Sequence, residues 1–203
     1  MLTKIKNELI YLSTLIRILS SLKSINNDEN FIITNKISSF ADKTPDSIAI
    51  YFEDKEITYK EFINRANQYS HWFLDNGLKK GDVVALLMEN RPEFLMSWIG
   101  IAQVGGTTAL INTNLTGHPL NHSLSISGAK KLILGKELLD NFETTNESIK
   151  SSFQVWVEGE SNKTKFNNLN QNLEKYETIK PTVAYNVTNQ DVALYIYTSG
   201  TTG

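Results

Sequence analysis

The sequence contains no cysteine, and this absence removes several kinds of site at once. Disulfide bonds, thiolate nucleophiles and cysteine-ligated zinc or iron–sulfur centres are excluded. The sequence also has no excess of positive charge, because its formal net charge at pH 7 is −2. We therefore expect no nucleic-acid partner bound through bulk electrostatics.

The amino-acid composition is typical of a folded protein. The 203 residues are 40% hydrophobic and 21% charged, which argues against disorder and allows a substantial core. A chain of this length corresponds to one domain, or to one domain and a tail.

The first residues form a distinct segment. Residues 2–22 are rich in Leu and Ile at spacings that fill one broad arc of a helix. Arg17 interrupts the run of about 20 apolar residues that a spanning helix needs, and it also breaks a signal-peptide pattern. The helix could lie in a membrane interface or pack on the domain. We expect residues 1–30 to be an amphipathic, membrane-associating segment with a linker, and residues 31–203 to form the body.

The body alternates between short apolar runs and helical patterns. Val83–Met88, Thr107–Ile111 and Lys131–Leu134 predict strands buried in a sheet, and Val192–Tyr197 predicts a last one. The alternation predicts an α/β fold with a mostly parallel sheet flanked by helices. Residues 136–190 are polar and Asn-rich, and their pattern indicates little.

A hairpin and a helix are expected before the first buried strand. Ile48–Glu53 and Glu56–Thr58 suit paired strands, with Asp54-Lys55 at the tip. Thr58 and Glu61 form a Thr-x-x-Glu capping box, which predicts the start of a helix.

Three further helices are expected. Residues 31–40 have a helical pattern, and Pro119–Ser127 predict a short helix closed by Gly128. Asn90 and Glu93 are expected to cap the helix that follows the first buried strand.

The last expected strand runs into a loop of glycine and small hydroxyl residues. Such a loop can cradle a phosphate, because glycine allows close backbone approach and successive N–H groups bind anions. It matches neither the Walker A nor the Gly-x-Gly-x-x-Gly pattern, and the same composition also suits an ordinary turn. The candidate cofactor-binding residues are Tyr195, Ile196, Tyr197, Thr198, Ser199, Gly200, Thr201, Thr202 and Gly203.

These nine residues resemble the phosphate-loop signature of the adenylate-forming (AMP-binding) enzymes. That superfamily includes acyl-CoA synthetases, peptide-synthetase adenylation domains and luciferases. Phe40–Ala49, Ile57–Phe62, Lys80–Ala85 and Glu89–Phe94 resemble other segments of the family in the expected order. The resemblance implies the start of the family's large N-terminal domain, incomplete in this sequence.

The subgroup is indicated by the region after Gly106. Ala109–Leu115, Gly117–Leu120 and Ile126–Lys130 are similar to the fatty acid transport protein / very-long-chain acyl-CoA synthetase branch. Members of this branch often carry an N-terminal membrane-associating segment. The resemblance therefore favours peripheral or N-terminally anchored membrane association through residues 1–22, with the active site on the cytoplasmic side.

The resemblance also implies a two-step reaction. A carboxylate attacks the α-phosphate of ATP to give an acyl-adenylate and pyrophosphate, and the thiol of CoA then displaces AMP. ATP, Mg²⁺ and CoA are the implied cofactors and co-substrates, and a long- or very-long-chain fatty acid is the implied substrate. Thr198–Gly203 would stabilise charge that builds up on the phosphates.

The family's catalytic residues are expected beyond Gly203. The family motif continues with a variable residue, Pro and Lys, and a catalytic Lys lies in a small C-terminal domain. We therefore expect this sequence to be the front part of an enzyme, cut inside the motif and inactive by itself.

Two alternatives remain open. The protein could adenylate an aryl or amino acid, or it could be a short, non-catalytic paralogue that acts in fatty-acid uptake. No metal site formed by protein side chains is expected. His118 and His122 stand four residues apart, but no third ligand is close in the sequence.

Overall fold

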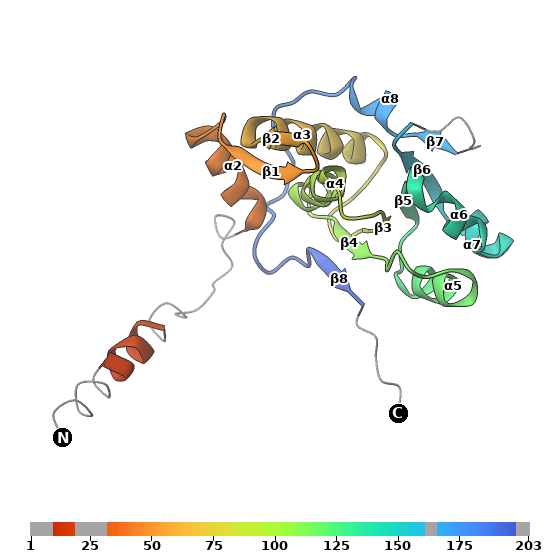
Figure 1. Ribbon diagram of the computed structural model, residues 1–203, viewed down its shortest axis with the longest axis horizontal. Helices are drawn as coiled ribbons and strands as arrows, with labels where there is room; N and C mark the ends of the chain where they lie inside the picture. Colours follow the sequence, from red (N-terminus) through yellow and green to blue (C-terminus); the bar gives the residue numbers. More distant parts are fainter. Residues whose placement is uncertain (1–9, 19–31, 161–165, 198–203) are drawn as a thin grey trace.

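Strands and helices alternate along the chain, as the sequence predicts. The computed structural model describes residues 10–18, 32–160 and 166–197 (Figure 1). In chain order the elements of the body are α2 (Ile33–Lys43), β1 (Ile48–Phe52), β2 (Lys55–Thr58), α3 (Tyr59–Asp75), β3 (Val83–Leu87), α4 (Pro92–Gln103), β4 (Thr107–Leu110), α5 (Gly117–Ile126), β5 (Lys131–Gly135), η2 (Lys136–Leu138), α6 (Leu139–Glu143), α7 (Glu147–Ser152), β6 (Gln154–Glu158), β7 (Asn167–Asn168), α8 (Asn170–Leu173) and β8 (Leu194–Ile196).

A six-stranded sheet organises the body. Its order is β7-β6-β5-β3-β4-β8, and each neighbouring pair runs parallel. A separate antiparallel pair is formed by β1 and β2. The predicted α/β fold with a mostly parallel sheet is confirmed.

Helices cover both faces of the sheet (Figure 1). One core joins alternate strand residues such as Leu86 and Ile133 to α3 and α4, and it includes the fully buried Trp72. The other core joins the intervening residues, such as Leu87 and Leu132, to α5 and α6. Each central strand is therefore buried on both faces, which explains its continuous apolar run.

The capping box predicted at Thr58 is confirmed. The Thr58 side chain accepts the Glu61 N–H, while the Glu61 carboxylate accepts the Thr58 N–H at 2.8 Å. These bonds satisfy backbone donors that every helix start leaves unpaired. The cap starts α3, which packs closely on α4 because Gly100 has no side chain. A Cβ at Gly100 would lie 2.5 Å from the Cβ of Tyr69.

The hairpin tip differs from the prediction. β2 begins at Lys55, so the tip is Glu53-Asp54 instead of Asp54-Lys55. Glu53 adopts a φ of 52°, the left-handed conformation that the tight turn requires. The helix predicted at residues 31–40 begins at Ile33 and continues to Lys43.

The predicted cap of α4 is wrong. The N-cap residue is Arg91, the first helical residue is Pro92, and no side chain caps the helix. Asn90 makes no cap, and Glu93 accepts a hydrogen bond from Arg91 at 2.8 Å. Local spacing could not reveal this, because Arg91 is held by residues far away in the sequence.

The last strand is shorter and less buried than expected. β8 spans Leu194–Ile196 and pairs with β4 at the end of the sheet, among the described strands. Ile196 is 69% exposed and Tyr195 is 41% exposed. The apolar run at Val192–Tyr197 therefore does not mark a strand buried on both faces.

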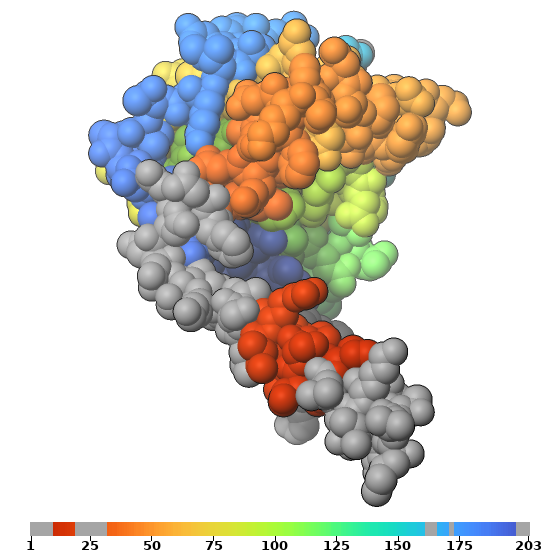
Figure 2. Space-filling view, turned by 90° about the vertical axis from the view of Figure 1, so that its left-hand side faces the viewer, coloured from red at the N-terminus to blue at the C-terminus, as the bar shows by residue number. Residues whose placement is uncertain are grey.

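The helix at residues 10–18 has no buried side chain. Its exposed apolar side chains range from Leu15 at 39% to Tyr11 at 69%, and Figure 2 shows this helix in red outside the body. The rest of the predicted segment, residues 1–9 and 19–30, lies outside the described residues. None of the helices that the structure describes is long and apolar enough to cross a membrane.

Candidate functional site at the carboxyl edge of the sheet

β8 ends at the edge where the parallel strands of the sheet end, and the candidate loop follows it in the sequence. Leu194, Tyr195 and Ile196 lie opposite Thr108, Ala109 and Leu110 of β4. The loop residues Thr198–Gly203 lie outside the described residues, so the structure places Tyr195, Ile196 and Tyr197 of the candidate set. The carboxyl edge of a parallel sheet is where α/β proteins bind ligands.

Tyr197 directly follows β8 and is anchored to the body. Its ring packs against the core that includes Leu120 and Leu124 of α5. Its buried hydroxyl has no hydrogen-bond partner among the described residues. Burial raises the pKa of the Tyr197 hydroxyl, and the nearby Tyr195 raises it further, so this group stays a neutral donor.

The segment before β8 is pinned to the body by polar contacts. Lys80 forms an ion pair with Asp191 at 2.9 Å between Nζ and Oδ2. The Thr107 hydroxyl donates to the Val192 carbonyl at 2.7 Å, and the Thr108 N–H donates to the Ala193 carbonyl at 3.0 Å. These contacts set the register of β8 and thereby the origin of the loop.

A braced turn follows β4 beside the end of β8. The Asn114 N–H donates to Oδ1 of Asn112 at 2.9 Å. Asn141 of α6 donates to the Thr113 carbonyl at 2.9 Å and thereby holds the turn. Both Asn112 and Asn114 are exposed at this edge.

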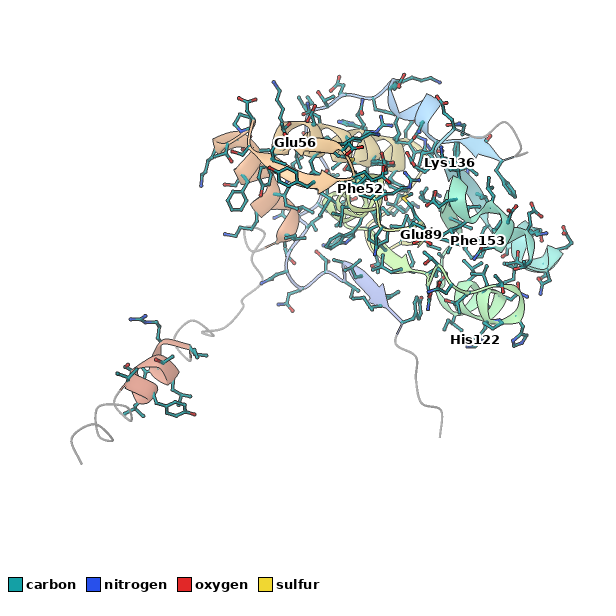
Figure 3. All side chains as sticks on the ribbon, viewed as in Figure 1. Phe52, Glu56, Glu89, His122, Lys136 and Phe153 are labelled. Atoms are coloured by element: carbon teal, nitrogen blue, oxygen red, sulfur yellow. The ribbon has the colours of Figure 1, made fainter. Side chains whose placement is uncertain are left out.

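A polar crevice of about 600 Å³ opens further along the same edge. The connections that follow β3 and β5 lead to helices on opposite faces of the sheet, and the crevice lies where they diverge. Figure 3 shows Phe52, Glu89 and Lys136 around this region, from the hairpin, the loop after β3 and the start of η2. Such a divergence point is a common ligand site in open α/β sheets.

Arg91 ties three connections together inside this crevice. Its guanidinium lies 2.8 Å from a carboxylate oxygen of Glu93, 3.3 Å from one of Glu137 and 2.6 Å from one of Glu158. It also donates to the Glu158 carbonyl at 3.1 Å. The cluster links the connections that follow β3 and β5 to the end of β6.

Burial and the charged partners shift the pKa values of Glu158 and Arg91 in opposite directions. Burial raises the pKa of Glu158, whose side chain is 1% exposed, while Arg91 acts in the opposite direction. Burial alone would lower the pKa of Arg91, but Glu158 and Glu137 raise it above its ordinary value. Arg91 is therefore a permanent cation that is paired with three carboxylates.

Sequence reasoning missed this cluster. Local spacing after the first buried strand indicates a helix cap at Asn90 and Glu93, and it gives no sign of the contacts of Arg91. Glu137 and Glu158 each stand at or just after the end of an apolar run. Charged residues at the carboxyl ends of several strands were the signal that could have identified the cluster.

Carboxylates outnumber cations around the crevice, but three of them are paired with Arg91. Among the described residues, no group of three or more His, Asp or Glu side chains could hold a metal. Mg²⁺ keeps several waters and commonly binds through one or two carboxylates together with substrate phosphates. A metal here would therefore be held chiefly by a phosphate ligand.

Comparison with known proteins gives consistent results. A family model described as "AMP-binding enzyme" matches residues 37–203. Long-chain fatty acid transport protein 6 of Homo sapiens is 32% identical over 174 residues, which cover 84% of this chain and 28% of that protein. The chain thus spans under a third of the length of this relative.

Solved structures share the fold. The anthranilate CoA ligase AuaEII in complex with anthranoyl-AMP matches with a TM-score of 0.75 and 25% identity, over 91% of this chain and 34% of the other. The N-terminal domain of FACL13 from Mycobacterium tuberculosis matches with a TM-score of 0.70 and 29% identity, over 84% of this chain and 42% of the other. The resemblance inferred from the sequence is confirmed, and the chain belongs to the family of AMP-binding, adenylate-forming enzymes.

Proposed function

We propose that the protein takes part in the ATP-dependent activation of a long- or very-long-chain fatty acid to its acyl-CoA, through an acyl-adenylate. One observation carries the proposal: β8 runs parallel to β4 and ends at Ile196 on the carboxyl edge of an adenylate-forming fold, and the sequence then continues as Tyr-Thr-Ser-Gly-Thr-Thr-Gly. The resemblance to fatty acid transport proteins supports the choice of substrate class.

The reaction requires groups that stabilise negative charge on the phosphates, and this loop carries such groups. When a carboxylate attacks the α-phosphorus, negative charge builds up on the phosphates as pyrophosphate leaves. Backbone N–H groups and the hydroxyls of Thr198–Thr202 would donate to the β- and γ-phosphate oxygens, and Mg²⁺ would neutralise part of the charge. The role of this chain is thus to bind and orient ATP, while CoA enters in the second step.

An aryl or amino acid substrate is the second candidate. AuaEII, which shares the fold, is an anthranilate CoA ligase crystallised with anthranoyl-AMP. A third candidate is a non-catalytic protein that binds lipid in fatty-acid uptake. That candidate predicts binding with no dependence on ATP.

We also propose a division of the chain with a location for each part. Residues 1–30 would form a membrane-associating segment and linker, and residues 31–203 the N-terminal part of the AMP-binding domain. The exposed apolar side chains at residues 10–18, together with Arg17, suit a helix lying in the interface of an anionic membrane. The protein would then be a peripheral membrane protein with its nucleotide site on the cytoplasmic side.

A product assay with a panel of acids tests the proposed function. The protein at its natural length is incubated with ATP, Mg²⁺, CoA and one acid at a time: palmitate, a C24 fatty acid, anthranilate or phenylalanine. We expect AMP and an acyl-CoA from the fatty acids alone. Turnover with anthranilate or phenylalanine only would support the second candidate, and no turnover with any acid would overturn the enzymatic proposal.

A further inference from the structure

The turn after β4 leads to an inference that rests on the proposed function. β4 and β8 are neighbours in a parallel ladder in which Leu110 lies opposite Ile196. Asn112 stands two residues beyond Leu110, and the Ser/Thr/Gly loop begins two residues beyond Ile196. Neighbouring strands lie only about 4.8 Å apart. Asn112 is therefore located beside the point from which the loop leaves the sheet.

The contacts of Asn112 leave its amide nitrogen available. Its Oδ1 accepts the Asn114 N–H at 2.9 Å, whereas its Nδ2 makes no hydrogen bond within the described part of the chain. An amide whose oxygen is engaged in this way presents two N–H donors elsewhere. The side chain is exposed, so a ligand can reach these donors.

The turn that contains Asn112 is held by hydrogen bonds to α6 and β3. Nδ2 of Asn141 lies 2.9 Å from the Thr113 carbonyl and 3.4 Å from the Leu115 carbonyl. The Ile111 N–H donates to the Leu86 carbonyl of β3 at 3.0 Å. Asn112 is thus fixed between two anchored residues, and fixed donors stabilise developing charge better than mobile ones.

We propose that Asn112 contacts the phosphates of ATP, donating from Nδ2 to an oxygen of the group that leaves as pyrophosphate. In the adenylation step, the bond from the acid's carboxylate oxygen to the α-phosphorus forms. The bond from the α-phosphorus to the bridging oxygen breaks, and its electron pair departs with pyrophosphate. Asn112 transfers no proton in this step. Its hydrogen bond strengthens as charge accumulates on that oxygen, which lowers the barrier.

Two substitutions separate this role from a structural one. Asn112→Asp retains an oxygen that can accept the Asn114 N–H, but it replaces the donors with an anionic oxygen. Asn112→Ala removes both the acceptor and the donors. The matched control is Asn114→Ala, since Asn114 is also exposed and uses only its backbone N–H in the turn.

The measurement is acid-dependent ATP–pyrophosphate exchange with the protein at its natural length. Both kcat and KM for ATP are determined, and thermal unfolding is followed in parallel. We expect the rate to fall on the order of 100-fold in Asn112→Asp and about 10-fold in Asn112→Ala. The rate of Asn114→Ala should stay within about twofold of wild type, because no phosphate-facing donor is removed.

Other outcomes overturn the proposal. A wild-type rate in Asn112→Asp together with a slow Asn112→Ala means that Asn112 serves only the turn. An equal loss in Asn114→Ala contradicts it as well. If the wild-type protein exchanges with an aryl or amino acid instead, the substrate proposal fails and the Asn112 variants are assayed with that acid. If it exchanges with no acid, ATP affinity is measured by calorimetry, and equal affinity in wild type and Asn112→Asp overturns the inference.

Discussion

Lys80 and Asp191 form an ion pair across the base of the sheet, 2.9 Å between Nζ and Oδ2. Lys80 lies just before β3, whereas Asp191 lies just before β8. The same lysine donates to the Asn186 carbonyl at 2.7 Å, and Asp191 accepts the Thr188 N–H at 2.8 Å. This pair connects the central strand to the edge strand that carries the candidate loop.

Asp191→Asn should reduce stability near neutral pH and have little effect in acid. Burial raises the pKa of Asp191, but the hydrogen bonds from Lys80 and the Thr188 backbone lower it below its ordinary value of 3.8. A lowered pKa means that ionised Asp191 stabilises the fold above pH 4, and this contribution disappears as the pH falls through the folded pKa. We expect a loss of about 1 kcal/mol at pH 7.

Urea unfolding at several pH values measures this difference. The control is Glu147→Gln, because Glu147 is 86% exposed in its contact with Lys150. It should leave the stability nearly unchanged at every pH. A difference between wild type and Asp191→Asn that grows as the pH falls below 4 would contradict the role assigned to the pair.

Arg91→Met should destabilise the protein strongly. The substitution leaves the carboxylate of Glu158, 1% exposed, without its cation. Breaking a buried pair from one side costs about 3–5 kcal/mol. The double variant Arg91→Met/Glu158→Leu should recover part of this loss, because it removes the unpaired charge as well.

A double-mutant cycle measured by urea unfolding gives the coupling between the two residues. Lys150→Met serves as the control, since Lys150 also contacts two carboxylates, but those of Glu143 and Glu147 are 52% and 86% exposed. Its effect should be small. Additive effects of the Arg91 and Glu158 substitutions would show that the cluster does not hold the edge of the sheet as described.

Substitutions in the N-terminal helix should weaken membrane binding. Leu12 and Ile16 are 52% and 58% exposed, and replacing both with Asn removes apolar surface that an interfacial helix would bury. Sedimentation with anionic liposomes measures the effect. We expect a loss of at least about tenfold in the bound fraction, comparable to deletion of residues 1–25.

Ile126→Asn provides the matched control for this test. Ile126 is 55% exposed on α5, in the body of the protein. Its substitution should leave liposome binding unchanged. Equal binding by wild type and the Leu12/Ile16 double variant would contradict membrane association through this helix.

Much of the fold could be predicted from local patterns. The capping box at Thr58 and Glu61 depends on two residues three positions apart. A buried strand such as Val83–Met88 is recognised by its continuous apolar run, since both of its faces are covered. Both features depend on residues that are close together in the sequence. The long polar region 136–190 concealed β6 and β7, because short strands in a polar context lack a distinctive pattern.

The site could be predicted only in part. The Ser/Thr/Gly loop has a distinctive sequence, but what covers β8 is a property of the whole sheet, so the exposure of Ile196 could not be foreseen. Two of the partners of Arg91 are Glu137 and Glu158, which lie 46 and 67 residues further along the sequence. Residue spacing near a helix start can indicate a cap. Contacts between residues so far apart in the sequence depend on which strands are neighbours in the sheet.

We propose that the loop after β8 holds ATP while a fatty acid is activated. The most direct measurement is fatty-acid-dependent ATP–pyrophosphate exchange by the protein at its natural length, comparing wild type with Thr201→Val. The control is Thr182→Val, an exposed threonine in the segment before β8. We predict exchange in wild type and the control, and a rate lower by about 10- to 100-fold in Thr201→Val. Exchange at the wild-type rate in Thr201→Val would contradict the account.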